Sequence, residues 1–285
     1  MENKIDISVI IPMYNAEKYI EETIQSIFNQ DEHGLSYEII IVDDLSKDNS
    51  KEIVRNIKSS KIKLIELNKN EGSANARNIG IQSAKGKWIQ FVDCDDKICN
   101  DLYKKFQNSQ KPEINCYVFS ALFVYADYTV KRTIIDVKDK SAFGYFYTIW
   151  NKFIKRDICM EFKNVSRQNE DVCFVFDMMN EKDLKISLIE DAYYIYNCKN
   201  AQSKMSNFNI KEYLNMFNYI YDRIDSSDKL TKMFFLESFV GIVFSKGMPL
   251  GMSLKVAIKT TFKLYNYLPS VYFKGIRNAI KNTRI

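Results

Sequence analysis

The first hundred residues alternate between short β-branched runs and amphipathic segments, and this alternation limits the fold more than any other feature. Strands are predicted at four apolar runs, residues 7–11, 37–42, 62–67 and 87–92. Helices are predicted between them at residues 16–30, 49–58 and 73–84. This order implies a parallel sheet with right-handed crossovers. The nearly continuous apolar strands indicate a sheet that is covered on both faces.

Polar residues follow three of these predicted strands at the point where each strand ends. The three groups are Pro12-Met13-Tyr14-Asn15, Asp43-Asp44-Leu45-Ser46 and Asp93-Cys94-Asp95-Asp96. Because ligands bind outside the carboxyl ends of the strands in such sheets, we expect all three groups to meet at one edge.

The last group places three carboxylates in four positions. Two carboxylates about 5 Å apart repel by about 3 kcal/mol at an effective dielectric constant near 20. Such a cluster is tolerated where it faces bulk water or where a cation lies between the acids. Convergence of the strand ends favours a binding site over a solvated turn.

Several other functional classes do not fit the motifs. The chain has no GxGxxG dinucleotide motif, and GIQSAKGKW fails as a P-loop because Trp88 follows Lys87. The stretch DCDDK begins like a dehalogenase-type phosphatase motif, but Lys97 stands where Thr or Val belongs. The only histidine, His33, lies in a polar stretch, which excludes a Ser-His-Asp triad. Any general base is therefore expected to be a carboxylate.

The cellular setting is predicted from what the chain lacks. The six cysteines are scattered without a CxxC pair, which argues against zinc and disulfides and favours a reducing compartment. The first residues show no signal-peptide pattern, and no apolar run approaches the roughly 20 residues of a membrane span. We expect a cytoplasmic protein.

The basic excess lies at the C-terminal end. Residues 238–285 hold eight Lys and Arg and no acid, whereas the whole chain has a net charge of +5, so the other 237 residues carry −3. Apolar residues accompany these charges at helical spacing. A packed basic helix is one interpretation, and nucleic-acid binding is disfavoured because no recognition motif is present. The favoured hypothesis is an interfacial helical region that docks on the anionic inner face of the cell membrane.

Five segments carry a family resemblance and occur in this order: SVIIPMYNAEKYIEETIQSIFNQ, YEIIIVDDLSKDNS, NEGSANARNIGIQSAKGKWIQFVDCDD, IWNKFIKRDI and NEDVCF. Together they resemble the family-2 glycosyltransferases over roughly residues 5–200. The resemblance implies a GT-A fold, with a mainly parallel α/β catalytic domain at residues 1–204. Its nucleotide-sugar half is residues 1–96, its acceptor half is 97–204, and a helical region at 205–285 follows.

The resemblance also implies roles at the donor site. Tyr14, beside Pro12 and Asn15, should stack on the nucleobase, and Asp43 should accept the N3 hydrogen of uracil. Arg77 should lie near the pyrophosphate or the sugar, although an ion pair with the carboxylate cluster is an equal alternative. The sequence departs from the family pattern at Leu45, where glycine is usual, and at Cys94, where serine is common.

The remaining implied roles concern the metal and the reaction. Asp95 should bind Mn²⁺ or Mg²⁺, with Asp96 as a substitute ligand, and Asp93 should reach either the ribose or the metal. Asp171 should act as general base with Glu170 as its orienting partner, although acids at a helix N-terminus are also favoured by the helix dipole. Trp150, Asn151 and Lys152 match the WNK of the family and either line the sugar or acceptor pocket or serve as packing residues.

The expected activity is inverting transfer of a hexose or N-acetylhexosamine from a UDP-sugar to a hydroxyl group of a glycan acceptor. A lipid-linked acceptor is expected at the membrane surface. A nucleotidyltransferase of the same fold would need a glycine-rich basic loop after the first strand, and PMYNAEKY has neither glycine nor arginine. A non-catalytic partner subunit would have no chemical need of both acidic motifs.

Overall fold

The predicted alternation of strands and helices forms the frame of the molecule. The computed structural model describes residues 5–133, 148–199, 209–224 and 227. Four parallel strands lie in the order β3-β2-β1-β4, with bounds Ile62–Glu66, Tyr37–Asp43, Ile7–Met13 and Trp88–Phe91. The helices that connect them are α1 (Ile20–Phe28), α2 (Ser50–Asn56) and α3 (Ser73–Ser83). The predicted α/β fold class is confirmed.

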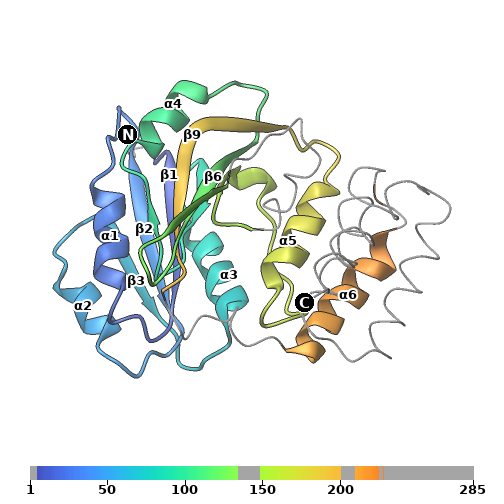
Figure 1. Ribbon diagram of the computed structural model, residues 1–285, viewed down its shortest axis with the longest axis horizontal. Coiled ribbons are helices and arrows are strands. Elements are labelled where there is room, and N and C mark those ends of the chain that lie inside the picture. The colour runs from blue at the N-terminus through green and yellow to red at the C-terminus, as the bar shows by residue number, and fades with distance from the viewer. Residues whose placement is uncertain (1–4, 134–147, 200–208, 225–226, 228–285) are drawn as a thin grey trace. The chain divides into compact units, whose positions relative to one another are not determined.

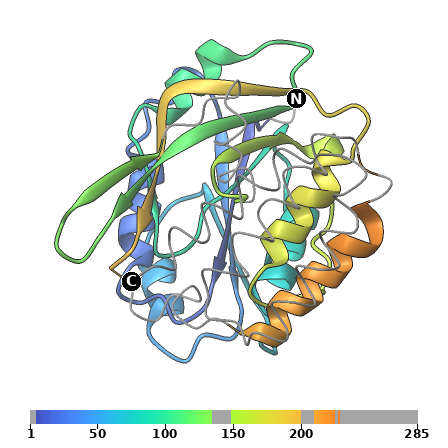
Figure 2. The same ribbon diagram turned by 45° about the vertical axis from the view of Figure 1, so that its right-hand side comes forward.

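The sheet continues beyond β4 with mixed pairing. The next strands in space are β8 (Lys152–Lys155), β6 (Cys116–Val124), β9 (Ile186–Asn197) and the short β5 (Lys97–Ile98), while β7 (Val130–Thr133) pairs with β6. β8 is antiparallel to both of its neighbours, whereas β6 and β9 run parallel and lie side by side in Figure 2. The sheet is therefore entirely parallel in its first half and mixed in its second half.

Helices cover both faces of the parallel half. Figure 1 shows α1 and α2 on one face and α3 on the other, so β1 is buried along its whole length. On α1, Ile20, Ile24 and Ile27 point into the core, as the helical spacing predicts. The approach of α3 to the sheet depends on Gly80, because a Cβ atom there would lie 2.3 Å from Ile10 Cγ2.

An aromatic cluster joins the two halves of the sheet. The ring of Trp88 at the start of β4 packs edge-on against Phe106 of α4 (Leu102–Ser109) and Tyr117 of β6. Phe106 also stacks on Phe153 of β8 at 4.0 Å between centroids. The second half of the sheet is thereby held to the first by apolar contacts. A 3₁₀ turn (Arg156–Ile158) and helix α5 (Glu170–Met179) complete this unit.

The chain divides into two compact units, residues 1–206 and 207–285. In the second unit the structure describes α6 (Ile210–Arg223), whose N-cap Asn209 accepts hydrogen bonds from the backbone N–H of Lys211 and Glu212. No helix among the described residues is long and apolar enough to cross a membrane. The predicted basic region at 238–285 lies outside the described residues.

Candidate functional site

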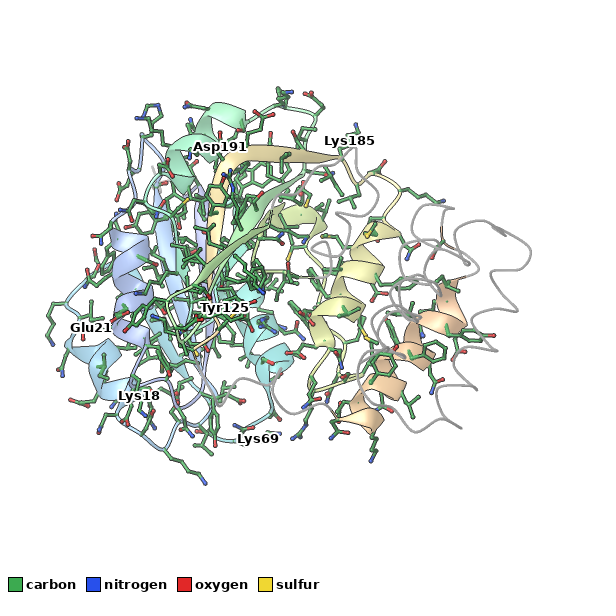
Figure 3. The ribbon with its side chains drawn as sticks, in the orientation of Figure 1. Lys18, Glu21, Lys69, Tyr125, Lys185 and Asp191 are labelled. Atoms are coloured by element: carbon green, nitrogen blue, oxygen red, sulfur yellow. The ribbon has the colours of Figure 1, made fainter. Side chains whose placement is uncertain are left out.

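The loops that follow β1 and β2 are joined to each other, as the predicted convergence of strand ends requires. The backbone N–H of Asp44 donates to the carbonyl of Met13 at 2.8 Å, and that of Asn15 donates to Ser46 Oγ at 3.0 Å. In Figure 3 this edge lies at the end of the unit where Lys18 and Lys69 are labelled, away from Lys185 and Asp191. The first two predicted groups therefore meet at one edge.

The turn after β2 departs from ordinary backbone geometry. Leu45 adopts a φ of 65° and its side chain is partly exposed. This left-handed region costs a residue with a Cβ atom roughly 1–2 kcal/mol, whereas glycine adopts it freely. Leucine at this position therefore strains the backbone locally. The loop nevertheless keeps its hydrogen bond from Asp44 to Met13 of β1.

The predicted base-binding residues occupy this edge. Tyr14 exposes 44% of its surface, whereas Pro12 is buried within β1. Asp43 is fully buried and its Oδ2 accepts the backbone N–H of Ser46 at 3.1 Å. Its other oxygen, Oδ1, has no hydrogen-bond partner among the described residues. A buried acceptor without a donor is costly, so this atom is suited to an N–H group of a ligand.

The structure gives Asp44 a structural role that the sequence did not reveal. Its two carboxylate oxygens accept the backbone N–H groups of Glu71 and Gly72, both at 2.8 Å. These bonds hold the segment that leads into α3. Adjacency to Asp43 was the only sequence signal for this residue.

Arg77 of α3 links the two acidic motifs. Its guanidinium group is buried, and it binds Asp93 Oδ1 at 2.8 Å and Glu170 Oε1 at 3.1 Å. Ser73, one turn earlier on α3, also donates a hydrogen bond to Glu170. Figures 1 and 2 show α3 beside α5, which begins at Glu170. Of the two roles open for Arg77, the structure shows the ion pair with the carboxylates.

Asp171 lies next to this network at the N-terminus of α5. Its side chain is partly exposed, and its Oδ1 accepts the backbone N–H of Val172 at 2.9 Å. Burial, together with the negative charge of Glu170, raises the pKa of Asp171 to about 7, although Arg77 acts in the opposite direction. A carboxyl group that titrates near neutral pH is suited to general base catalysis.

The three acids after β4 have different surroundings. Asp93 and Asp95 are partly exposed, whereas Asp96 is buried and its Oδ1 accepts the backbone N–H of Asn197 at 2.7 Å. Burial and the charges of Asp95 and Asp93 raise the pKa of Asp96 well above its ordinary value. Through its hydrogen bond to Asn197, Asp96 anchors the end of β9.

The fit of this cluster to a divalent cation can be judged from its donors. Asp93 and Asp95 present carboxylate oxygens, the donor type that Mg²⁺ and Mn²⁺ prefer. In the part of the chain that the structure describes, no group of three or more His, Cys, Asp or Glu side chains is arranged to hold a metal by itself. Two carboxylates therefore fit part of a coordination shell that the oxygens of a diphosphate would complete.

The WNK residues lie in the interior. Trp150 is almost fully buried, and Asn151 and Lys152 are completely buried. Asn151 Nδ2 donates to the carbonyl of Phe119 at 3.1 Å, and Lys152 Nζ donates to Asn151 Oδ1 at 2.9 Å. Burial lowers the pKa of Lys152 to about 8. These residues pack in the interior, and a place at the sugar or acceptor pocket stays a prediction.

Tyr194 of β9 connects this interior group to the acidic cluster, and the sequence analysis did not identify it. Its ring stacks on Trp150 with 4.4 Å between centroids. Its hydroxyl oxygen accepts the backbone N–H of Asp93 at 2.9 Å. The position of Asp93 therefore depends on a strand that lies about a hundred residues later in the chain.

Comparison with known proteins shows which family this chain is similar to. The model of the family "Glycosyl transferase family 2" matches residues 8–173, more than half of the chain. An uncharacterised glycosyltransferase of Haemophilus influenzae is 45% identical over 104 residues, which are 36% of this chain and 41% of that protein. Poly(ribitol-phosphate) β-N-acetylglucosaminyltransferase TarP of Staphylococcus aureus is 29% identical over 216 residues, 70% of this chain and 65% of TarP.

Solved structures show the same fold. The crystal structure of S. aureus TarS 1–349 in complex with UDP-GlcNAc matches with a TM-score of 0.71 at 20% identity, covering 98% of this chain and 92% of that one. A mannosyltransferase from Pyrobaculum calidifontis, in complex with GDP-Man and Mn²⁺, matches with a TM-score of 0.61 at 14% identity, covering 99% and 82%. The predicted GT-A fold is confirmed by these likenesses.

Proposed function

Because the chain belongs to glycosyl transferase family 2, we propose that it transfers a hexose or N-acetylhexosamine from a UDP-sugar to a hydroxyl group of a glycan in cell-surface polysaccharide synthesis. The relatives named for poly(ribitol-phosphate) glycosylation and for teichuronic acid biosynthesis support this class of acceptor. The chain spans about two fifths of the length of the first relatives that it matches, so donor and acceptor are proposals for this protein.

The observation that carries the proposal is the network around Arg77, which brings the acids after β4 to the N-terminus of α5. In the proposed reaction Asp171 takes the proton of the acceptor hydroxyl group. The acceptor oxygen then forms a bond to the anomeric carbon as the bond to the diphosphate breaks on the opposite face. This single displacement inverts the anomeric configuration. Glu170 orients the site through Arg77.

The donor would bind at the edge formed by the loops after β1 and β2. Tyr14 presents an exposed ring on which a base can stack, and Asp43 Oδ1 offers an acceptor to the N3–H of uracil. This pairing favours uracil over cytosine, whose N3 carries no hydrogen. Asn15 holds the same edge by accepting the backbone N–H of Lys47 at 2.9 Å.

A divalent cation fits the remaining part of the site. Asp95 and Asp93 would hold Mn²⁺ or Mg²⁺, which would act as a Lewis acid on the departing diphosphate. Asp96, whose Oδ1 holds the end of β9, would serve as a substitute ligand. Arg77 compensates part of the negative charge of Asp93 whether or not a cation is bound.

A donor panel tests the proposal. Purified protein is incubated with UDP-, GDP- and dTDP-sugars, with Mn²⁺, with Mg²⁺ or with EDTA, and nucleotide release is measured. We expect release from a UDP-sugar that requires the divalent cation. Release that persists unchanged in EDTA would remove the metal from the proposal. Tight UDP binding without any release, for every donor and acceptor glycan tested, would indicate a non-catalytic partner subunit.

The proposal also covers the acceptor and the cellular location. We propose a lipid-linked acceptor and a peripheral position at the inner face of the cell membrane, with residues 238–285 as the membrane contact. The net charge of +8 in this region supports it. The active site would then meet a lipid-linked glycan at the surface.

A further inference from the structure

A second concave region lies at the opposite edge of the sheet from the candidate site. This basic cleft has a volume of about 680 Å³ and is lined by Ile5, Lys85, Lys87, Lys155, Arg156 and Asp157. Lys87 directly precedes β4, whereas Asp93 follows that strand. At about 3.3 Å per residue, the cleft and the acidic cluster are separated by about 20 Å.

Within the described structure, the four cations of the basic cleft are not compensated by carboxylate partners. Eight basic residues form ion pairs with carboxylates in the described structure, namely Arg55, Lys61, Lys69, Arg77, Lys97, Lys104, Lys105 and Arg132. Among the described residues, none of the four cleft cations has a carboxylate within ion-pair distance, although Asp157 also lines the cleft. Uncompensated like charges in a concavity attract an anion.

The backbone beneath these side chains is held rigidly. The N–H of Lys87 donates to the carbonyl of Ile5 at 3.1 Å, and the N–H of Arg156 donates to the carbonyl of Lys87 at 2.9 Å. A Cβ atom on Gly86 would lie 2.4 Å from the backbone nitrogen of Ser8, so the two segments are in close contact. The cleft is therefore built from three chain segments that are joined by backbone hydrogen bonds.

The side chains are also partly positioned. The Nζ atoms of Lys87 and Lys155 lie 5.9 and 5.8 Å from the ring centroid of Trp88, so they are less than about 12 Å apart. The neighbouring acid Glu38 is already engaged, because its Oε1 accepts hydrogen bonds from Ser8 Oγ and from the backbone N–H of Lys85. Glu38 forms no ion pair with a cleft cation among the described residues.

We propose that the basic cleft binds a phosphate group, carried either by a lipid headgroup or by a soluble phosphate ester. Arginine and lysine are the side chains that bind phosphate oxygens most strongly, and an arginine can do so with two parallel hydrogen bonds. The volume lies within the range of small-ligand sites. The inference rests on the charge and shape of the cleft, and not on the activity proposed for the opposite edge.

The test compares two variants with the same change in charge. The cleft variant is Lys87→Glu with Arg156→Glu, and the control is Lys58→Glu with Lys182→Glu, two exposed lysines outside the cleft. Binding of glycerol phosphate is measured by calorimetry. Binding to phosphatidylglycerol and phosphatidylcholine vesicles is measured by sedimentation at low and high salt. All proteins keep residues 238–285, so a difference between variants reports the cleft.

We expect the cleft variant to bind at least tenfold more weakly than wild type and control to one of the two anionic probes. If only the binding to phosphatidylglycerol vesicles is lost, the ligand of the cleft is a lipid headgroup. If the binding of glycerol phosphate is lost, the ligand is a soluble phosphate ester. Equal binding by cleft and control variants, or no binding of either probe by wild type, overturns the proposal. Thermal unfolding checks that both variants fold. If the cleft variant does not fold, the single substitution Lys87→Gln replaces it. UDP affinity should be unchanged, which separates this result from a failure of the proposed function.

Discussion

At the level of single residues, the candidate site depends on how one buried cation and several acids compensate one another. Burial opposes ionisation of Arg77, yet the charges of Asp93 and Glu170 more than offset it and hold its pKa above the ordinary value. The same two acids are separated by 77 positions in the chain. Arg77 therefore stabilises the fold and positions both acidic motifs at once.

Replacing this cation is predicted to be severely destabilising. Arg77→Met leaves Asp93 and the buried Glu170 without their common partner, and removal of one member of a buried ion network costs about 3–5 kcal/mol. Urea denaturation should therefore show a large fall in the free energy of unfolding. Arg55→Met is the control, since its pairs with Glu52 and Glu66 are exposed, and its effect should be much smaller. Similar losses for the two variants would contradict a structural role of the Arg77 network.

Asp171 is predicted to control the pH dependence of transfer. With a pKa of about 7 it is the proton acceptor only when deprotonated, so kcat should rise about tenfold per pH unit below 7 and level off above it. Asp171→Asn should lower kcat by about 10²–10⁴-fold while UDP affinity stays nearly unchanged. Asp177→Asn, on the same helix, is the control. An Asp171→Asn protein that retains more than about a tenth of the activity would exclude Asp171 as the base.

The same pKa also predicts a stability effect with a definite sign. Folding raises the pKa of Asp171, so its protonated form is favoured in the folded state and its ionisation opposes folding. Wild type should lose stability relative to Asp171→Asn as pH rises from about 4 to about 7, and the difference should then stay constant. Urea titrations at several pH values measure this difference. A difference in stability that does not change with pH would show that folding does not raise the pKa of Asp171.

At the level of elements, strand β9 holds the loop that carries the acidic cluster. Its Tyr194 accepts the backbone N–H of Asp93, and its Asn197 donates to Asp96. Trp150 fixes the ring of Tyr194 by stacking on it. Trp150 is thus connected to the acidic cluster through β9, although it is itself buried.

Tyr194→Phe is predicted to loosen this loop without disturbing the core. The phenylalanine ring keeps the stacking on Trp150 but leaves the N–H of Asp93 without its acceptor, at a cost of about 1–3 kcal/mol. We expect a higher Mn²⁺ concentration for half-maximal activity and a lower kcat. Tyr193→Phe, whose hydroxyl group reaches exposed Asp191 on the same strand, should behave like wild type. An unchanged metal requirement in Tyr194→Phe would show that β9 does not position the cluster.

At the level of the whole molecule, charge is distributed unevenly along the chain. Residues 238–285 carry +8, and the basic cleft adds four cations at one edge of the sheet. The predicted membrane contact and the cleft are separate features, because they share no residue. Each can be changed without the other.

Membrane docking through residues 238–285 is tested by removing charge from the full-length protein. Substituting Lys255, Lys259 and Lys263 with glutamine should weaken sedimentation with anionic vesicles, since each basic residue near the surface contributes about 1 kcal/mol. Three such losses correspond to about a hundredfold or more. Substituting Lys51, Lys58 and Lys182 with glutamine is the matched control. Equal sedimentation of the two variants, or no preference for anionic over neutral vesicles, would return this region to ordinary packing.

The sequence by itself determined the frame and the edge where the acids gather. Apolar periodicity is a local property, so it placed β1, β2, α1 and α3 to within a few residues. Parallel pairing then required their polar ends to share one edge. The mixed pairing in the second half of the sheet does not change this, because the three polar groups follow β1, β2 and β4, which all lie in the parallel half.

Only the tertiary structure decided what each acid does there. That Asp96 anchors β9, and that Arg77 pairs with two carboxylates, depends on partners as many as 101 positions away. The burial of Trp150, Asn151 and Lys152 and the role of Tyr194 depend on the same distant pairings. Desolvation and the resulting pKa values arise from three-dimensional packing, and local sequence patterns carry no measure of it.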